Sequence, residues 1–291
     1  MSKIDSAILM AGRGSRLSPL TDDIPKPMIK LFGKKLYEHS LEQLSQIDFD
    51  LKAVNAHHRA EEIEQEFRGG KVKVVTEKIL RGTGGGISGL KKHLKSDPYM
   101  IANSDVIWSA DLKDALDQFR QKAIALMLIA MPNEDGELWI NRKNQIFFIE
   151  NTGMQKAKEE ASWRATFCGI HLISNAISLR IPEEENFCIV RGFYKKLIEE
   201  KEYPIAYKAK KFYDLGTFER IFSFYKKYEE SSNLNKASFE GDLFNTYGEG
   251  KLLGGKGSRL ENVVILGDVE IESGAQIKNS ILSEKYGILP F

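Results

Sequence analysis

Cysteine is scarce in this chain, and its spacing excludes two kinds of site. The 291 residues include two cysteines, Cys168 and Cys188, with no CxxC spacing and no cluster of further thiols. Isolated cysteines of this kind fit buried thiols in a reducing compartment better than a disulfide framework or a zinc site. We therefore expect two buried thiols and a cytoplasmic protein.

Long apolar runs and an excess of either charge are also lacking. No apolar run approaches the roughly 18 residues of a membrane span, and no basic segment followed by a long apolar core opens the sequence. The 42 Lys and Arg residues are balanced by 41 Asp and Glu residues, which leaves a formal net charge of +1. The sequence therefore predicts no membrane helix, no signal peptide and no general attraction to nucleic acid or an anionic membrane. Any anion must bind through locally placed groups.

Apolar segments and amphipathic segments alternate through the first part of the chain. Strands are expected at residues 6–10, 51–56, 72–76, 99–103, 123–131 and 166–174, and helices at 34–46, 60–67, 86–94, 111–120, 186–200 and 217–228. This alternation is typical of a parallel sheet with helices on both faces. The stretch "ELWINRKNQIFFIEN" reads as a short antiparallel excursion, so we predict a mostly parallel, mixed sheet in a domain spanning residues 1–228.

The composition changes after residue 228. The polar stretch "KKYEESSNLNK" spans residues 226–236, and residues 229–257 are expected to form a linker. Residues 258–291 alternate apolar and turn residues, and Val263, Val269 and Ile277 recur at roughly hexapeptide-like steps. This pattern predicts a short parallel β-helix segment of one or two coils. Because such a segment is too short to be stable alone, we expect it to pack on the main domain or on another subunit, giving a homo-oligomer.

A glycine-bearing, cationic loop, "AGRGSRLSPLTDDIPKPM", follows the first predicted strand. Gly12 and Gly14 would let backbone N–H groups approach a phosphate chain without interference from Cβ. Arg16 adds a planar cation that can bind phosphate oxygens at two points. The loop lacks the GxxxxGK[ST] pattern of a P-loop. It also lacks the third glycine of a GxGxxG fingerprint, because position 17 is leucine. A bare GxG also occurs in ordinary tight turns, so this pair alone leaves both interpretations open.

The longer stretch "ILMAGRGSRLSPLTDDIPKPMI" resembles the signature of the sugar-1-phosphate nucleotidyltransferases. That signature runs small-Gly-x-Gly-[ST]-Arg-[LM], then Pro-Leu-Thr, then Pro-Lys-Pro. Four further stretches follow in the family's order: "EKILRGTGGGI", "ANSDVIW", "FCGIHLIS" and "FYDLGTFERI". Arg81 replaces a usual leucine and Ser104 replaces a glycine. The resemblance covers most of residues 6–228 and is closest to short bacterial members that make GDP-mannose, GDP-heptose or UDP-N-acetylmuramate.

The resemblance implies a fold and a reaction. The fold is a Rossmann-like three-layer α/β domain, with a left-handed form for the β-helix tail. In the reaction, an oxygen of a sugar 1-phosphate attacks the α-phosphorus of an NTP, with Mg²⁺ bound and pyrophosphate leaving. The resemblance assigns Arg16 and Lys26 to catalysis, Ala11, Gly12, Gly14, Glu77, Gly82, Thr83 and Gly84 to the nucleotide, Gly169, Glu150 and Asn151 to the sugar, and Asp105 and Asp214 to Mg²⁺.

Several of these residues have a structural alternative. Asp105 and Asp214 each precede a helix, where a helix-capping role is the alternative. Lys26, taken without the upstream motif, reads as an exposed lysine in a proline turn. The stretch "IENTG" lacks the Glu-Lys-Pro with which many relatives grip the sugar phosphate. Lys208 or Lys210 would replace that lysine, although an exposed strand lysine is the simpler interpretation.

The functional hypotheses differ in substrate and in whether the chain is active. The leading one is an enzyme that acts on an NTP and a sugar 1-phosphate, with a mannose-type or heptose-type guanylyltransferase favoured. The alternatives are a uridylyltransferase for an N-acetylated sugar 1-phosphate, a phosphocholine cytidylyltransferase, and an inactive regulatory subunit of the same fold. The regulatory hypothesis is disfavoured because Arg16, Lys26, Asp105 and Asp214 are all present.

Overall fold

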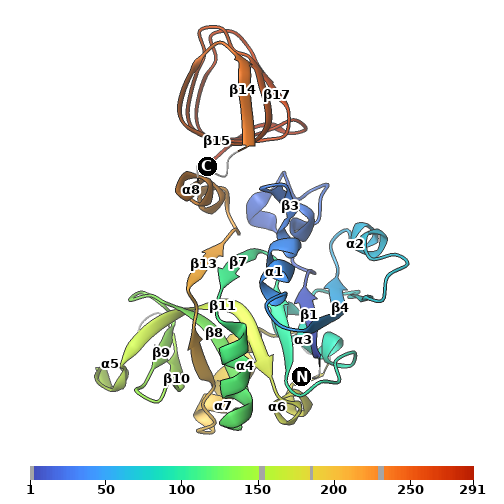
Figure 1. Ribbon diagram of the computed structural model, residues 1–291, viewed down its shortest axis with the longest axis vertical. Helices are drawn as coiled ribbons and strands as arrows, with labels where there is room; N and C mark the ends of the chain where they lie inside the picture. Colours follow the sequence, from blue (N-terminus) through green and yellow to red (C-terminus); the bar gives the residue numbers. More distant parts are fainter. Residues whose placement is uncertain (1–2, 151–154, 184–185, 229–232) are drawn as a thin grey trace. The chain divides into compact units, whose positions relative to one another are not determined.

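A computed structural model describes residues 3–150, 155–183, 186–228 and 233–291 (Figure 1). The chain divides into two units. The first unit comprises Met1–Arg13 and Tyr37–Phe212, and the second comprises Gly14–Leu36 and Tyr213–Phe291. The cationic loop from residue 14 onward therefore belongs to the same unit as the C-terminal tail.

A nine-stranded mixed sheet forms the centre of the first unit. Its main path runs β10-β9-β11-β6-β1-β4-β5, and β8 pairs with both β11 and β12. The pairs β1–β4, β1–β6, β4–β5 and β8–β12 are parallel, whereas β11 runs antiparallel to β6, β8 and β9. The strands are β1 (Ile4–Leu9), β4 (Phe49–Ala56), β5 (Lys73–Thr76), β6 (Tyr99–Asn103), β8 (Leu126–Pro132), β9 (Leu138–Ile140), β10 (Ile146–Ile149), β11 (Trp163–Ile173) and β12 (Ile205–Lys208). The predicted mixed sheet, with a parallel centre and an antiparallel excursion, is confirmed.

Helices accompany this sheet along the chain. They are α1 (Leu36–Leu44), α2 (Ala60–Glu66), α3 (Gly82–Lys91), α4 (Leu112–Gln121), α5 (Gln155–Glu160), α6 (Asn175–Arg180), a π-helix η3 (Ile189–Tyr194) and α7 (Lys195–Glu199). The short strand β7 (Val106–Ser109) follows β6, and the chain passes into the second unit within β13 (Lys211–Asp214). No helix within the described ranges has the length and apolarity that crossing a bilayer requires.

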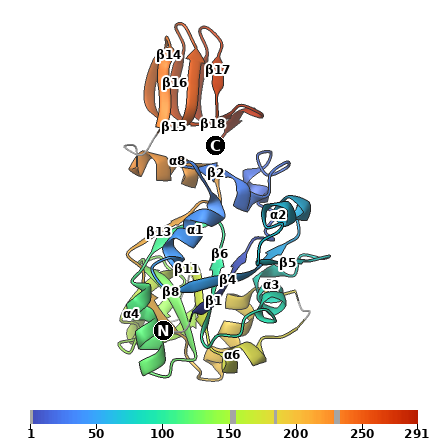
Figure 2. The ribbon, with the colours of Figure 1, turned by 45° about the vertical axis from the view of Figure 1, so that its right-hand side comes forward.

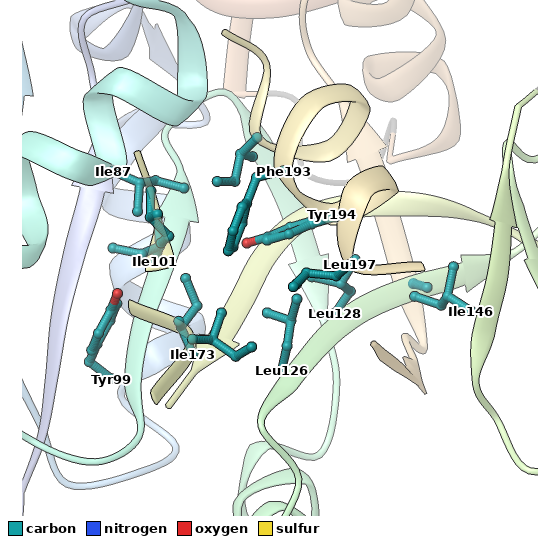
Figure 3. Close-up of a cluster of buried hydrophobic side chains, with 14 of the residues drawn as sticks. Ile87, Tyr99, Ile101, Leu126, Leu128, Ile146, Ile173, Phe193, Tyr194 and Leu197 are labelled. Carbon is teal, nitrogen blue, oxygen red and sulfur yellow. The ribbon is translucent and has the colours of Figure 1, made fainter. Parts of the chain in front are cut away.

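Two apolar cores cover the two faces of the sheet. Because side chains alternate along a strand, β8 sends Leu126 and Leu128 into one core and Met127 and Ile129 into the other. The first core also takes residues of α3 and α7, and the second takes residues of α4. Figure 3 shows the first core, with its labelled side chains converging from helices and strands. The unit is therefore a helix–sheet–helix sandwich.

Local chemistry explains two differences from the sequence expectations. Helix α3 begins at Gly82 rather than Gly86. Its glycines are helical residues that pack against a neighbouring segment, since a Cβ at Gly84 would lie 2.3 Å from the ring of Phe187. Of the two thiols, Cys168 is buried as expected, but Cys188 is exposed. The expectation for Cys188 was therefore wrong, and its segment runs along the surface just before the π-helix.

Parallel strands make up the tail of the second unit. The parallel strands are β14 (Asn233–Phe239), β15 (Asp242–Gly254), β16 (Arg259–Leu266), β17 (Val269–Ile271) and β18 (Gln276–Ser283), and β19 (Gly287–Pro290) pairs antiparallel with β18. The other elements of this unit precede the tail in the chain and are η1 (Ser15–Leu17), η2 (Lys26–Met28), β2 (Lys30–Leu31), β3 (Lys34–Lys35) and α8 (Phe218–Lys227). Figure 2 shows the tail strands side by side. Residues 233–254, which composition placed in a linker, form β14 and β15.

A constant offset relates successive strands of the tail. Asp242 pairs with Arg259, which pairs with Gln276. At the same offset of 17 residues, the side-chain amides of Asn245, Asn262 and Asn279 donate from one to the next over 3.0 and 2.8 Å. All three asparagines have positive φ, a conformation that asparagine tolerates better than most residues. An apolar core that includes Leu252, Leu260 and Ile277 fills the interior of the tail.

Candidate functional site

The carboxyl ends of the parallel strands bring the first group of predicted site residues to one edge of the sheet. Leu9 of β1 lies opposite Asn55 of β4 on one side and opposite Asn103 of β6 on the other. The segment after β1, which carries Ala11, and the segment after β6, which carries Asp105, therefore start from neighbouring strands at the same edge of the sheet. Ligands of open α/β sheets bind at this edge.

A buried amide–carboxylate pair fixes the start of the loop. The Oδ1 of Asn55 accepts the N–H groups of Met10 at 2.7 Å and Ala11 at 3.3 Å. Its Nδ2 donates over 2.7 Å to Glu77, which is 4% exposed and also accepts the N–H of Arg81 at 3.2 Å. Glu77, predicted to contact the nucleotide, is thus engaged in holding two loops. Asn55 sets the direction in which the chain leaves β1.

Two neighbours brace the turn that carries Asp105. The hydroxyl of Ser40 donates over 2.9 Å to the carbonyl of Asn103 and lies 3.3 Å from that of Val106. Gly169 on β11 has φ +80°, and a Cβ there would lie 2.6 Å from the amide nitrogen of Asn103. The glycine is therefore required for the strand to pass Asn103. Asp105 itself is half-buried between these supports.

Residues 186–189 cover the start of α3. The N–H of Gly84 donates to the carbonyl of Phe187 at 2.9 Å, and the hydroxyl of Thr83 accepts the N–H of Ile189 at 3.0 Å. A Cβ on Gly82 would lie 2.6 Å from that same Phe187 carbonyl. This close backbone packing is the physical reason for the glycines.

The predicted sugar-side residues are less well defined. Glu150 is exposed and forms an ion pair with Lys195 at 2.8 Å, while Asn151 lies outside the described residues. The ammonium group of Lys208 lies 4.7 Å from the ring centroid of Trp163, as expected of a strand lysine packed on an aromatic neighbour. Gly169, the third predicted sugar-side residue, packs instead against Asn103 beside the turn that carries Asp105.

In the second unit, two glycines allow the loop cations to pack closely. A Cβ on Gly14, where φ is +67°, would lie 2.9 Å from the Cβ of Lys26. Lys26 is 6% exposed, so it is not the exposed lysine that the alternative interpretation requires. Arg16 is exposed, and its Nη2 would lie 2.8 Å from a Cβ placed on Gly216. Asp214 Oδ1 would lie 2.7 Å from the same point, so the guanidinium group lies beside this carboxylate.

Neither predicted metal ligand caps a helix. The N-cap of α4 is Asp111, and the N-cap of α8 is Thr217. Asp214 instead accepts the N–H of Gly216 at 2.8 Å through Oδ1 and pairs with Arg220 through Oδ2. Within the described ranges, no three His, Cys, Asp or Glu side chains gather closely enough to hold a metal ion.

The domain is an α/β fold with a glycine-bearing loop that follows the carboxyl end of β1 and contains Arg16 and Lys26. The sequence model of the nucleotidyl transferase family matches residues 6–137. Over residues 6–137 the chain is therefore similar to the nucleotidyl transferase family.

Relatives of known activity match over a larger part of the chain. The bifunctional protein GlmU of Methanococcus maripaludis is 28% identical over 200 residues, covering 67% of this chain and 47% of its own length. The mannose-1-phosphate guanylyltransferase of Mycobacterium tuberculosis is 26% identical over 227 residues, covering 74% of this chain and 62% of its own length. The chain thus spans about half the length of the GlmU relatives it matches.

Solved structures share the fold. HddC from Yersinia pseudotuberculosis, in complex with GMP-PN, aligns with a TM-score of 0.62 at 23% identity, covering 77% of this chain and 99% of its own. An apo UDP-glucose pyrophosphorylase aligns with a TM-score of 0.63 at 17% identity, covering 79% and 99%. At these identities the likeness concerns the fold.

Proposed function

We propose that the protein transfers a nucleotidyl group from an NTP to a sugar 1-phosphate, releasing pyrophosphate and an NDP-sugar. The observation that carries this proposal is the signature loop, which starts at the carboxyl end of β1 and leads to exposed Arg16 and buried Lys26. The family match over residues 6–137 supports the same class of reaction.

The reaction asks for charge neutralisation and positioning rather than for a nucleophilic side chain. An oxygen of the sugar phosphate forms a bond to the α-phosphorus, and the bond from that phosphorus to the pyrophosphate oxygen breaks. Two anions must meet, and negative charge grows on the leaving group, so fixed cations supply most of the rate. In our proposal, Gly12 and Gly14 present backbone N–H groups, Arg16 stabilises the leaving pyrophosphate, and Lys26 neutralises the α-phosphate.

The remaining predicted residues keep proposed roles in substrate binding. Ala11 and the start of α3, at Gly82, Thr83 and Gly84, would lie along the nucleotide. Glu77 would support both segments through its hydrogen bonds with Asn55 and with the N–H of Arg81. Gly169, Glu150 and Asn151 are the proposed sugar-side residues. Variants of these residues are expected to change the KM of one substrate more than that of the other.

Asp105 and Asp214 fit Mg²⁺ by their chemistry. Both offer carboxylate oxygens, the ligand type that this ion prefers together with waters and substrate phosphates. Asp214 pairs with Arg220, so a bound ion would compete with that guanidinium for the carboxylate. When bound, Mg²⁺ would offset the charge of the triphosphate.

We favour a guanylyl donor with a mannose-type or heptose-type sugar phosphate, in line with the mannose-1-phosphate guanylyltransferase among the relatives. Uridylyl transfer is the second candidate, because GlmU and a UTP–glucose-1-phosphate uridylyltransferase of Synechocystis also match, the latter at 28% identity over 214 residues.

The test is pyrophosphate release with each of the four NTPs against a panel of sugar phosphates and phosphocholine, with Mg²⁺ and with EDTA. We expect Mg²⁺-dependent release with one base and one sugar class. Absence of turnover with every pair would contradict the proposal and favour a regulatory subunit. Release with CTP and phosphocholine would favour the cytidylyltransferase.

For the tail, we propose a short left-handed parallel β-helix that pairs with a second subunit. The parallel pairing at a constant offset supports the coil, and exposed Phe244 and Ile288 supply apolar surface for a partner. Light scattering at micromolar concentration should give the mass of a dimer or larger; a monomer mass would contradict the pairing.

A further inference from the structure

A single carboxylate in the tail accepts hydrogen bonds from the tip of a hairpin that follows Lys26. The hairpin of β2 and β3 turns at Phe32 and Gly33, whose φ values of 53° and 72° are those of a tight turn with both central residues left-handed. The N–H of Phe32 donates to Glu249 Oε1, and the N–H of Gly33 donates to Glu249 Oε2 over 2.6 Å. The hydroxyl of Tyr225 donates to Oε1 over 2.6 Å. Glu249 therefore accepts from three donors, two of them adjacent backbone amides.

Aromatic packing reinforces this contact. The ring of Phe32 stacks on that of Tyr225 with centroids 4.3 Å apart, and it meets the ring of Phe224 edge-on at 5.2 Å. Burial, together with the hydrogen bond to Glu249, raises the pKa of Tyr225 above its ordinary value. Hydrogen bonds to an ionised carboxylate are stronger than neutral ones, so the hairpin tip is firmly held.

A second contact holds the chain ahead of Lys26. Asp23 accepts a hydrogen bond from the Tyr286 hydroxyl over 2.7 Å and pairs with Lys285, also at 2.7 Å. Tyr286 and Lys285 lie between β18 and β19. Because this pair is largely exposed, it contributes less than the Glu249 contact.

We propose that the tail positions Lys26 for the reaction, with Glu249 as the main positioning residue and Tyr286 as the second. Lys26 lies between the two anchor points, Asp23 and the Phe32–Gly33 turn, and both are held by side chains of residues 249–286. A cation must be fixed in place to stabilise charge that develops during a reaction, since loss of position costs rate even when the group is retained. The inference rests on the proposed function, and it gives the tail a role in turnover.

The experiment compares Glu249→Gln with Glu261→Gln in the full chain. Glutamine can accept at one atom but presents an NH₂ group to the other N–H donors. Glu261 is the matched control, because it is a tail carboxylate whose partners, Lys278 and Arg259, also belong to the tail. For Glu249→Gln we expect kcat to fall about tenfold with a smaller change in the KM for NTP, and amide hydrogen exchange of residues 23–33 to increase. Glu261→Gln should change neither.

Two milder variants keep the test decisive if Glu249→Gln folds poorly. Tyr225→Phe removes one donor and keeps the ring, and Tyr286→Phe weakens the second anchor; each should shift kcat and exchange in the same direction by less. Unchanged exchange at residues 23–33, or increased exchange with unchanged kcat, would overturn the inference. If the wild-type chain turned over no substrate, the exchange data would still decide whether Glu249 anchors the Lys26 segment, so failure of the proposed function is distinguishable.

Discussion

At the scale of single residues, Lys26 has an unusual environment for a lysine. Lys26 is 6% exposed and lies so close to Gly14 that a Cβ on that glycine would lie 2.9 Å from the lysine Cβ. Lysine is rarely buried to this degree unless its ammonium group is paired. The combination favours a fixed cation rather than a surface charge.

We therefore expect Lys26→Ala to lower kcat by about 10²-fold or more, as the loss of a fixed transition-state charge typically does. Lys30→Ala, an exposed lysine in the same segment, should leave kcat within about twofold of wild type, because it lies outside the proposed machinery. Steady-state kinetics and urea midpoints of both variants measure this. Equal activity of the two variants would refute the role of Lys26.

His171 offers a test of the core. Complete burial lowers its pKa to about 3, and its Nδ1 lies 2.7 Å from the hydroxyl of Tyr194. The folded protein thus keeps this imidazole neutral where the unfolded chain takes up a proton below about pH 6.5. The free energy of unfolding should fall as the pH drops from about 6.5 toward 3, by up to about 1.4 kcal/mol per pH unit from this group.

The measurement is the urea-unfolding free energy of wild type and of His171→Gln between pH 7 and pH 5. The variant lacks the titrating group, so its unfolding free energy should change less over this range. If the unfolding free energies of the two proteins changed equally with pH, the pKa of His171 would not be lowered in the folded state, which would contradict this prediction.

At the scale of elements, two site glycines have different reasons to be glycine. Gly169 has φ +80° in β11 and meets Asn103, so Gly169→Ala should cost about 2 kcal/mol or more of stability. Gly12 has open space where a Cβ would lie, with nothing within 4 Å, and no left-handed φ, so Gly12→Ala should leave stability unchanged and weaken NTP binding. Thermal unfolding and titration with NTP separate the two effects. A destabilised Gly12→Ala would mean that this turn is structural.

The sequence allowed good predictions where the pattern is local. Period-2 and helical patterns located β6 at Tyr99–Asn103 and α8 near residues 217–228, because apolar alternation reports directly on burial. Helix α3 was placed too late, since its glycines were interpreted as loop residues rather than as contacts with Phe187. Strands β14 and β15 fell in a polar stretch whose pairing depends on neighbouring strands rather than on its own composition.

Partners distant along the chain were beyond prediction. Asn55 holds the loop start from 45 residues away, and Glu249 holds the hairpin from 216 residues away. Glu249 lies in a stretch without a distinctive spacing, and nothing in the sequence of Asn55 and its neighbours names Met10 and Ala11 as its partners. The family resemblance found the residues proposed to touch substrate, while the residues that support them emerged only from the fold.

At the scale of the whole molecule, the chain combines an α/β domain, similar over residues 6–137 to the nucleotidyl transferase family, with a parallel-stranded tail. The signature loop from residue 14 onward shares a unit with that tail. The tail is therefore proposed to act in turnover through the Lys26 segment as well as in assembly. A cytoplasmic location and the identity of the sugar stay predictions.

The most direct test of the central claim is mass spectrometry of the products formed from an NTP and a sugar 1-phosphate in the presence of Mg²⁺. We predict a nucleotide sugar and pyrophosphate in equal amounts with wild type, and a strongly reduced yield of both with Lys26→Ala. Pyrophosphate released without any nucleotide sugar, or no product from any pair of substrates, would contradict the account.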